Sequence, residues 1–156
     1  MSLEAVKAFF HTLGRENDIL EFPVSSATVA LAAEAVGAVP ARIAKTLSFM
    51  TPDGPILIVA AGDTKVDNRK FKDAFHCKAT FLSPEQVLEY TGHAVGGVCP
   101  FALKTPVPIF LDESLRRFET VFPAAGSANS AIELAPAELE GLCEGSRWVD
   151  VCKISE

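Results

Sequence analysis

The chain has 156 residues, of which 49% are hydrophobic and 22% charged, with a formal net charge of −6 at pH 7. This balance is typical of a globular domain and excludes a disordered chain. The acidic surplus disfavours broad coating of nucleic acid, because non-specific binding needs cations that neutralise phosphates. The longest apolar run, around residues 56–61, is far shorter than the ~20 residues that span a membrane. We expect one domain over residues 1–156, cytoplasmic and without a membrane partner.

The first half of the chain is predicted to contain helices and a hairpin. In chain order, the pattern predicts a helix over residues 3–13, a strand over 19–22, a helix from Ser26 or Thr28 to Val36, and strands over 45–50 and 55–61. Gly14 and Gly37 follow the two helices and indicate their ends. The turn Thr51-Pro52-Asp53-Gly54 joins the two strands, so they are predicted to form a hairpin.

The second half alternates shorter elements. In chain order it predicts a helix over 67–75, an extended segment over 77–82, a helix over 84–90, strands over 107–111, 121–122 and 131–134, a helix over 135–144, and a strand over 148–151. Ser83 and Gln86 form a capping box at the start of the second of these helices. Strands joined by hairpins outnumber strand–helix–strand units, which favours an α+β fold with a mixed, largely antiparallel sheet.

A glycine-rich loop spans residues 92–100, with Gly92, Gly96, Gly97 and Pro100. Glycine allows positive φ and close approach of a ligand, and proline fixes the exit of the loop. Such a loop can turn successive backbone N–H groups toward one point, which suits an anionic oxygen or a polarised carbonyl. The alternative interpretation is an ordinary glycine-rich turn.

Several common site types are excluded by the motifs. The sequence has no Gly-x-Ser-x-Gly elbow, no phosphate-binding P-loop and no Gly-x-Gly-x-x-Gly fingerprint. No pair of cysteines has the Cys-x-x-Cys spacing of a zinc site. We therefore expect no metal and no cofactor, and we interpret the cysteines as reduced thiols.

Basic residues provide two further candidate sites. Lys45 opens an apolar strand, where its charge could point into a cleft and hold a phosphate or polarise an ester carbonyl. The alternative is a strand-end lysine in water. A local basic face is also possible, formed by Lys65, Arg69, Lys70, Lys72 and Lys78; its alternative is a solvated helix face of mixed charge.

Three segments together resemble a known family. They are Lys45-Thr46-Leu47, then residues 95–100, then Ile132-Glu133-Leu134 with the following Pro136-Ala137-Glu138-Leu139. In order and spacing they are similar to the YbaK/ProX/EbsC family, the free-standing relatives of the editing domain inserted in bacterial prolyl-tRNA synthetase. The resemblance covers nearly the whole chain. It implies an α+β fold on a barrel-like sheet, and hydrolysis of the ester that joins an amino acid to the wrong tRNA.

The resemblance also implies site residues. Lys45 matches the family's functional lysine near the tRNA 3′ end, and Gly96 and Pro100 match the ends of its Gly-x-x-x-Pro loop, whose backbone contacts the aminoacyl ester. The predicted catalytic residues are Lys45, Gly96, Gly97, Val98, Cys99 and Pro100. The predicted substrate-binding residues are His93, Phe101, Ser127, Asn129 and Ser130. For His93 the alternative is a cap on the preceding turn, and for the three polar residues it is turn hydrogen bonding.

The chain departs from the family pattern at two positions. Cys99 stands where relatives often carry a hydroxyl residue, and we interpret it as a small loop residue and not as a nucleophile. Ala131 stands where relatives that act on cysteinyl-tRNA can carry an acidic residue, and residues 100–103 are similar to alanine-editing relatives. The amino acid removed is therefore left open between cysteine and alanine.

These observations predict a trans-editing deacylase that acts on mischarged tRNA, most simply Cys- or Ala-tRNA(Pro). The expected partners are the tRNA acceptor end and an aminoacyl-tRNA synthetase. One alternative is a tRNA- or synthetase-binding module of the same fold that does not hydrolyse the ester. A second alternative is a thiol-redox protein that uses Cys99.

Overall fold

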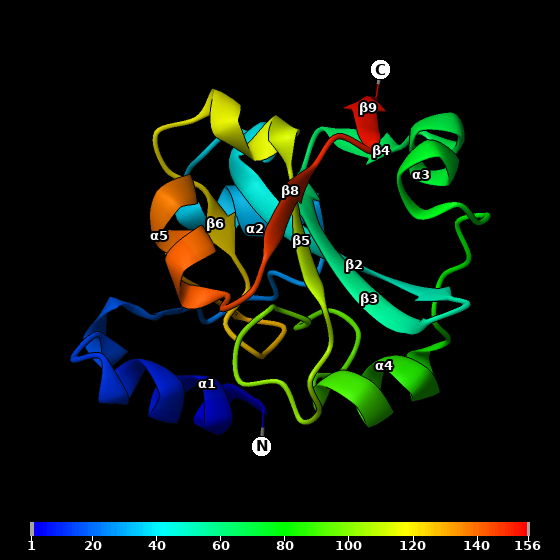
Figure 1. Ribbon diagram of the computed structural model, residues 1–156. Coiled ribbons are helices and arrows are strands. Elements are labelled where there is room, and N and C mark those ends of the chain that lie inside the picture. Colours follow the sequence, from blue (N-terminus) through cyan, green and yellow to red (C-terminus); the bar gives the residue numbers. More distant parts are fainter. Residues whose placement is uncertain (1, 156) are drawn as a thin grey trace.

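The molecule is built on a curled, mixed sheet of five strands (Figure 1). The computed structural model describes residues 2–155. The sheet contains β2 (Ile43–Thr51), β3 (Gly54–Ala61), β5 (Ile109–Asp112), β6 (Phe122–Pro123) and β8 (Arg147–Val149) in the order β6-β2-β3-β5-β8. β2 and β3 pair antiparallel as a hairpin, whereas β6 pairs with β2, β5 with β3, and β8 with β5 in parallel.

Two short antiparallel pairs lie beside this sheet. β1 (Leu20–Glu21) pairs with β7 (Ser130–Ala131), and β4 (Thr64–Val66) pairs with β9 (Cys152–Ile154). An isolated bridge between Ala124 and Ala131 connects the first pair to the strand that continues from β6.

The outer edge of β2 is divided between two partners. At one end, Ile43 and Ala44 pair with β6. At the other end, Phe49 bridges to Phe81, and the N–H of Met50 donates to the carbonyl oxygen of Thr80 at 2.8 Å. Between these contacts, residues 45–47 pair only with β3, so the edge of the sheet opens there.

Helices surround the sheet. They are α1 (Ser2–Thr12), α2 (Val29–Val36), α3 (Asn68–Phe75), α4 (Pro84–Thr91) and α5 (Pro136–Leu142), with 3-10 turns at Glu16–Asp18, Pro40–Arg42 and Glu113–Arg117. The side chains of Thr28 and Asp67 cap α2 and α3, and Ser83 and Gln86 form the capping box of α4. Within residues 2–155, no helix is long and apolar enough to cross a bilayer.

β3 divides the core into two layers because its side chains alternate between the two faces of the sheet. Val59 and Ala61 pack in a cluster that includes Phe10 of α1 and Leu139 of α5. Ile58 and Ala60 pack in a second cluster around Phe71 of α3. The sheet is therefore covered by α1 and α5 on one face and by α3 on the other (Figure 1).

The α+β class, the mixed barrel-like sheet and the central hairpin are confirmed. The five-stranded sheet contains more parallel pairing than the hairpin pattern predicted, because helices or 3-10 turns separate β3 from β5 and β5 from β8. The strand predicted over 131–134 is shorter, since only Ser130–Ala131 is a strand and Leu134 forms an isolated bridge to Val121. The β4–β9 pair was not predicted.

Candidate active site

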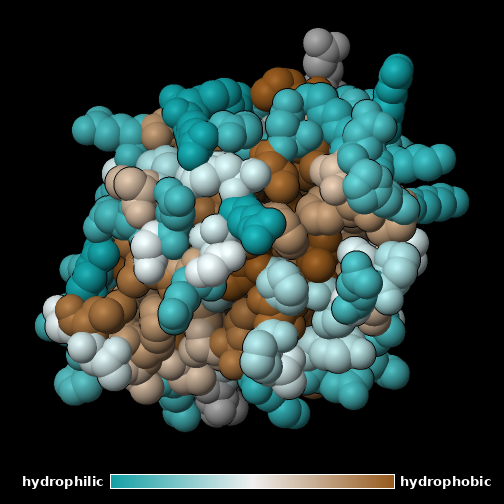
Figure 2. All heavy atoms as spheres, in the orientation of Figure 1, coloured by the Kyte–Doolittle hydropathy of each residue, from teal (hydrophilic) through white to brown (hydrophobic). Residues whose placement is uncertain are grey.

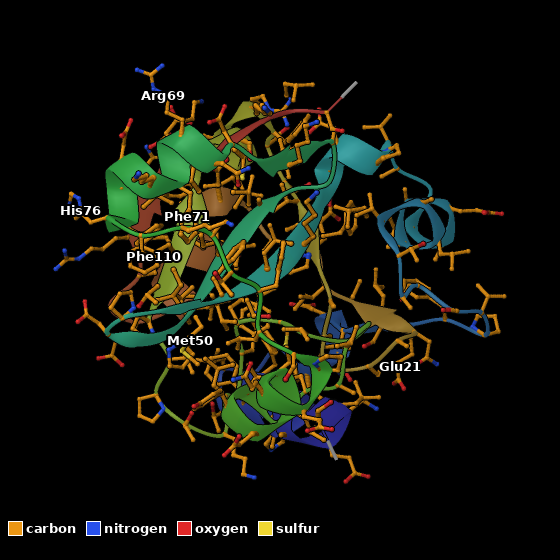
Figure 3. All side chains as sticks on the ribbon, turned by 90° about the vertical axis from the view of Figure 1, so that its right-hand side faces the viewer. Glu21, Met50, Arg69, Phe71, His76 and Phe110 are labelled. Carbon is orange, nitrogen blue, oxygen red and sulfur yellow. The ribbon has the colours of Figure 1, made fainter. Side chains whose placement is uncertain are left out.

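The opening along β2 forms one wall of a cavity of about 390 Å³. The other walls come from residues 26–32 before and within α2, residues 81–87 at the start of α4, residues 95–98 of the glycine loop, and residues 122–131. Figure 3 faces the side of the molecule where α3 and α4 lie, with the connection between them crossing the view. Segments far apart in the sequence thus meet around the stretch of β2 that contains Lys45.

Lys45 is a half-buried residue that lines the cavity. Its ammonium group donates to the carbonyl oxygen of Thr64 in β4. Burial lowers the pKa of Lys45 below its ordinary value of 10.5, while Cys152 and the carboxylate of Asp63 act in the opposite direction. A cation with reduced access to water attracts an anion or a carbonyl dipole more strongly than one in bulk solvent.

The glycine loop packs closely against the segments on either side of it. Gly96 has a φ of +98°, and a Cβ at this position would lie 3.2 Å from the Cβ of Ala27. A Cβ on Gly97 would lie 2.8 Å from the backbone of Ser127, which is closer than real contacts allow. Both glycines are needed for the loop to reach its place in the cavity wall.

Two backbone N–H groups of the loop belong to residues that line the cavity and have no acceptor within the part of the chain that the structure describes. The N–H of Gly97 donates to the carbonyl oxygen of Ala94 at 3.0 Å. Within residues 2–155, the N–H groups of Gly96 and Val98 donate to no backbone or side-chain acceptor, and both residues line the cavity. Two backbone N–H groups with one residue between them can bind the same oxygen atom.

His93, Cys99 and Phe101 lie behind the loop and do not line the cavity. The Nε2–H of His93 donates to the carbonyl oxygen of Phe101 at 2.7 Å, which fixes the proton on that nitrogen. Burial lowers the pKa of His93, and it raises the pKa of the Cys99 thiol to about 12. Pro100 is also buried and lines a different hollow. These residues hold the two ends of the loop together.

Ser130 is the predicted polar residue that does line the cavity. Its hydroxyl lies 2.7 Å from that of Ser127, which in turn donates to Oδ1 of Asn129 at 2.9 Å. The amide nitrogen of Asn129 donates to the carbonyl oxygen of Phe22 at 3.0 Å. Ser127 and Asn129 therefore fix the turn that carries Ser130.

The structure adds residues that the sequence analysis did not select. Within residues 2–155, the hydroxyls of Ser26 and Thr46 are buried without a hydrogen-bond partner, and both residues line the cavity. Thr46 lies in the strand predicted over residues 45–50, and the structure places it at the cavity. Phe81 also lines the cavity and is 62% exposed.

Two predicted features lie outside the cavity. In the 132–134 segment, Ile132 and Leu134 are fully buried, and Glu133 accepts a hydrogen bond from Nη2 of Arg42 at 3.1 Å. The basic residues are on or beside α3; Lys70 is paired with Asp150 at 3.0 Å, while the rest of the cluster is exposed: Lys65, Arg69, Lys72 and Lys78. Figure 3 shows Arg69 projecting outward from this helix.

A second hollow, of about 650 Å³, lies between residues 100–109 and the end of α5. It contains Lys104 and Glu144 but neither Lys45 nor the free loop N–H groups. Apolar surface by itself does not single out a site, since an irregular band of apolar side chains bordered by hydrophilic ones is visible on the face shown in Figure 2. In residues 2–155, no group of three or more His, Cys, Asp or Glu side chains could hold a metal ion.

Comparison with known proteins shows the family of this chain. The aminoacyl-tRNA editing domain family matches residues 24–142, which include Lys45, the glycine loop and Ser130. The chain belongs to this family. The editing domain is 56% identical over 154 residues to the uncharacterized protein YwhH of Bacillus subtilis strain 168, covering 98% of each chain. It is also 28% identical over 89 residues to a proline–tRNA ligase of Levilactobacillus brevis, covering 55% of this chain and 15% of the ligase.

Solved structures are similar to the editing domain over most of its length. One is described as a candidate trans-editing enzyme for prolyl tRNA synthetase; it has a TM-score of 0.88 and 33% identity, with 97% of each chain covered. Another is a hypothetical protein with a TM-score of 0.79 and 29% identity, covering 86% of this chain and 90% of the other. These similarities extend the family resemblance from sequence motifs to the whole fold.

Proposed function

We propose that this editing domain is a trans-editing aminoacyl-tRNA deacylase of the cytoplasm, which hydrolyses the ester of a mischarged tRNA. The proposed substrate is tRNA(Pro) carrying alanine or cysteine. One observation carries the proposal: Lys45 lines the same cavity as Gly96 and Val98, whose backbone N–H groups have no acceptor within residues 2–155. A synthetase is the second proposed partner, because a proline–tRNA ligase contains a segment similar to part of this chain.

The proposed chemistry relies on positioning and electrostatics. The N–H groups of Gly96 and Val98 bind the ester carbonyl oxygen and stabilise the negative charge that develops on it, an effect that can reach ~3 kcal/mol per donor. Lys45 binds the phosphate or ribose oxygens of the 3′ end. Water attacks the carbonyl, assisted by a ribose hydroxyl or by the side chain of the substrate. An aminoacyl ester is already activated, so no enzyme nucleophile is needed, and Cys99 remains a thiol.

The cavity also provides a basis for choosing small amino acids. Its volume of about 390 Å³ is at the lower end for ligand sites. The cavity walls include small and branched side chains such as Ala32, Leu47 and Val98. In this proposal proline is excluded because it is too large for the cavity. Exclusion by size is needed because attractive contacts with one additional methylene discriminate only weakly between two amino acids. The hydroxyls of Ser26 and Thr46 are available to bind the α-amino group.

The test is a deacylation assay over a panel of tRNAs charged with alanine, cysteine, serine and proline. The proposal predicts release of alanine or cysteine from tRNA(Pro), with Pro-tRNA(Pro) left intact. Binding of these tRNAs without release of any amino acid would instead support the non-catalytic module. Release from Pro-tRNA(Pro) at the same rate would contradict selection by size.

A further inference from the structure

We infer that Phe81 forms a binding site for a purine base at the mouth of the cavity. The ring would stack on the terminal adenine of the tRNA acceptor end while the aminoacyl ester reaches the glycine loop. This inference rests on the proposed function, which it deepens by assigning a position to the nucleoside part of the substrate.

The position of Phe81 separates it from the other apolar side chains at the surface. Within residues 2–155, Phe81 is the one aromatic side chain among the exposed large hydrophobic residues, and 62% of its surface is accessible. It also lines the cavity together with Lys45 and Gly96. A large apolar ring left open to water beside a functional cavity indicates a ligand contact more strongly than one on a featureless surface.

The ring is held rigidly from behind. Its centroid lies 4.6 Å from that of Phe49, which is fully buried, with an angle of 33° between the planes. The backbone on either side of Phe81 is tied to β2: the N–H of Met50 donates to Thr80 at 2.8 Å, and the N–H of Leu82 donates to Ser48 at 3.0 Å. One face of the ring is thus supported by the core while the residue stays open to solvent. A preorganised ring loses little conformational entropy when a base stacks on it.

The chemistry of the neighbouring groups favours a base as the occupant. In an aminoacylated acceptor end, the ester, the ribose and the terminal adenine are joined in this order. With the ester carbonyl at Gly96 and Val98 and the ribose or its phosphate at Lys45, we place the base at Phe81, the lining residue that is open to solvent. Aromatic side chains bind unpaired bases by stacking, and such contacts are worth ~1–3 kcal/mol per base.

Three substrates that share one amino acid test the site: the aminoacyl-tRNA, the aminoacyl-adenosine and the amino acid methyl ester, with the amino acid chosen from those that the tRNA panel shows to be released. In Phe81→Ala we expect KM to rise about 10-fold for the two substrates that contain adenosine, and to stay unchanged for the methyl ester. Phe81→Trp should keep KM within about threefold, because indole also stacks. Leu88→Ala is the matched control, since Leu88 is 52% exposed on α4 and does not line the cavity; it should behave as wild type.

Direct binding provides a readout that does not depend on turnover. Titration of Phe81→Trp with adenosine monophosphate should quench the fluorescence of the new indole, with the wild-type protein, whose one tryptophan is Trp148, as the reference. An unchanged KM in folded Phe81→Ala would overturn the inference. So would an equal loss with the methyl ester, which would mean that Phe81 only shapes the cavity. If the wild type releases no amino acid from any substrate, the proposed function fails, and the titration still decides whether Phe81 binds a purine.

Discussion

The sulfur of Cys99 lies 3.5 Å from Nε2 of His93, and both groups point at the carbonyl oxygen of Phe101. A carbonyl only accepts hydrogen bonds, so Nε2 of the imidazole carries a proton and cannot remove one from the thiol. The pair therefore differs from a cysteine–histidine catalytic dyad, in which the imidazole acts as a base. Through the carbonyl oxygen of Phe101, the contacts of His93 and Cys99 join the start of the glycine loop to its end.

The first prediction concerns Cys99. We expect Cys99→Ser to retain deacylase activity within about threefold, because the proposed reaction uses loop N–H groups and no protein nucleophile. Placing a hydroxyl in this buried position should lower the free energy of unfolding by ~1–2 kcal/mol. Deacylation kinetics and thermal unfolding of the same preparation check both points. Complete loss of activity in a folded Cys99→Ser protein would show that the thiol takes part in the reaction.

Thiol reactivity should follow burial. All four cysteines are free, and burial raises the pKa of Cys99, Cys143 and Cys152 to about 12. Only Cys77 is partly accessible. Iodoacetamide at neutral pH should therefore label Cys77 in the native protein, and labelling of Cys77→Ser should be negligible until the protein unfolds. Rapid labelling of Cys99 in the native state, with a change in activity, would revive the thiol-redox alternative.

The second prediction concerns the pH dependence of stability that follows from the burial of Lys45. Because its pKa is lowered in the folded state, the unfolded chain binds more protons between that value and the ordinary value of 10.5. The contribution of this group to stability should therefore increase as pH rises through this interval. Relative to Lys45→Met, the wild type should become more stable as the pH rises toward the ordinary lysine value of 10.5. Denaturant unfolding of the two proteins across this range measures the difference, and a decrease would contradict the burial of this charge.

The third prediction concerns the fit of the glycine loop. Gly97→Ala should destabilise the protein by ~2 kcal/mol, because the new Cβ would meet the backbone of Ser127, which cannot move as a side chain can. Gly141→Ala in α5 is the matched control, since a Cβ there meets nothing within 4 Å. It should raise the free energy of unfolding by ~0.5–1 kcal/mol. Equal effects of the two substitutions in urea unfolding would argue against close packing of the loop.

The fourth prediction compares two threonines whose hydroxyl groups are buried. The hydroxyl of Thr46 has no partner, whereas that of Thr64 donates to the carbonyl oxygen of Ala61 at 2.7 Å. Thr46→Val should stabilise the protein by ~1 kcal/mol, and Thr64→Val should destabilise it by ~1–3 kcal/mol. If Thr46 binds the α-amino group of the substrate, kcat/KM should fall about 10-fold in the more stable variant. A Thr46→Val protein with lower stability and full activity would refute both parts.

Local elements of the fold could be predicted because their causes are local in the sequence. The capping box of Ser83 and Gln86 stands at the start of α4 as predicted, Thr28 is the one of two predicted starts that caps α2, and the turn that ends at Gly54 joins the hairpin. The pairing of β4 with β9 could not be predicted, because it connects three-residue strands from distant parts of the chain. The parallel strand pairs could not be predicted for the same reason, because strand order depends on packing between distant segments.

The candidate site could be predicted only in part. Lys45 and the glycine loop were candidates from their residue types, and their resemblance to a family favoured the functional interpretation over the structural alternatives; the structure places them around one cavity. Ser26 and Thr46 were missed, since a serine before a helix and a threonine in a half-buried strand are common structural features. Their functional interest arises from buried hydroxyls without partners, which depends on the surrounding fold. Phe81 was missed for the same reason, because its exposure is a property of the assembled surface.

The most direct test of the proposed deacylase is single-turnover hydrolysis of Ala-tRNA(Pro) and Cys-tRNA(Pro) by the wild type and by Lys45→Ala. Thermal unfolding of both proteins and their affinity for uncharged tRNA(Pro) serve as controls. With the fold intact, we expect hydrolysis of at least one of these substrates by the wild type and a rate lower by about 100-fold in Lys45→Ala, because Lys45 is proposed to hold the 3′ end so that the ester reaches the loop, and misplacing a substrate costs an effect of this size. Equal rates in the two proteins, or no hydrolysis of either substrate by the wild type, would contradict it.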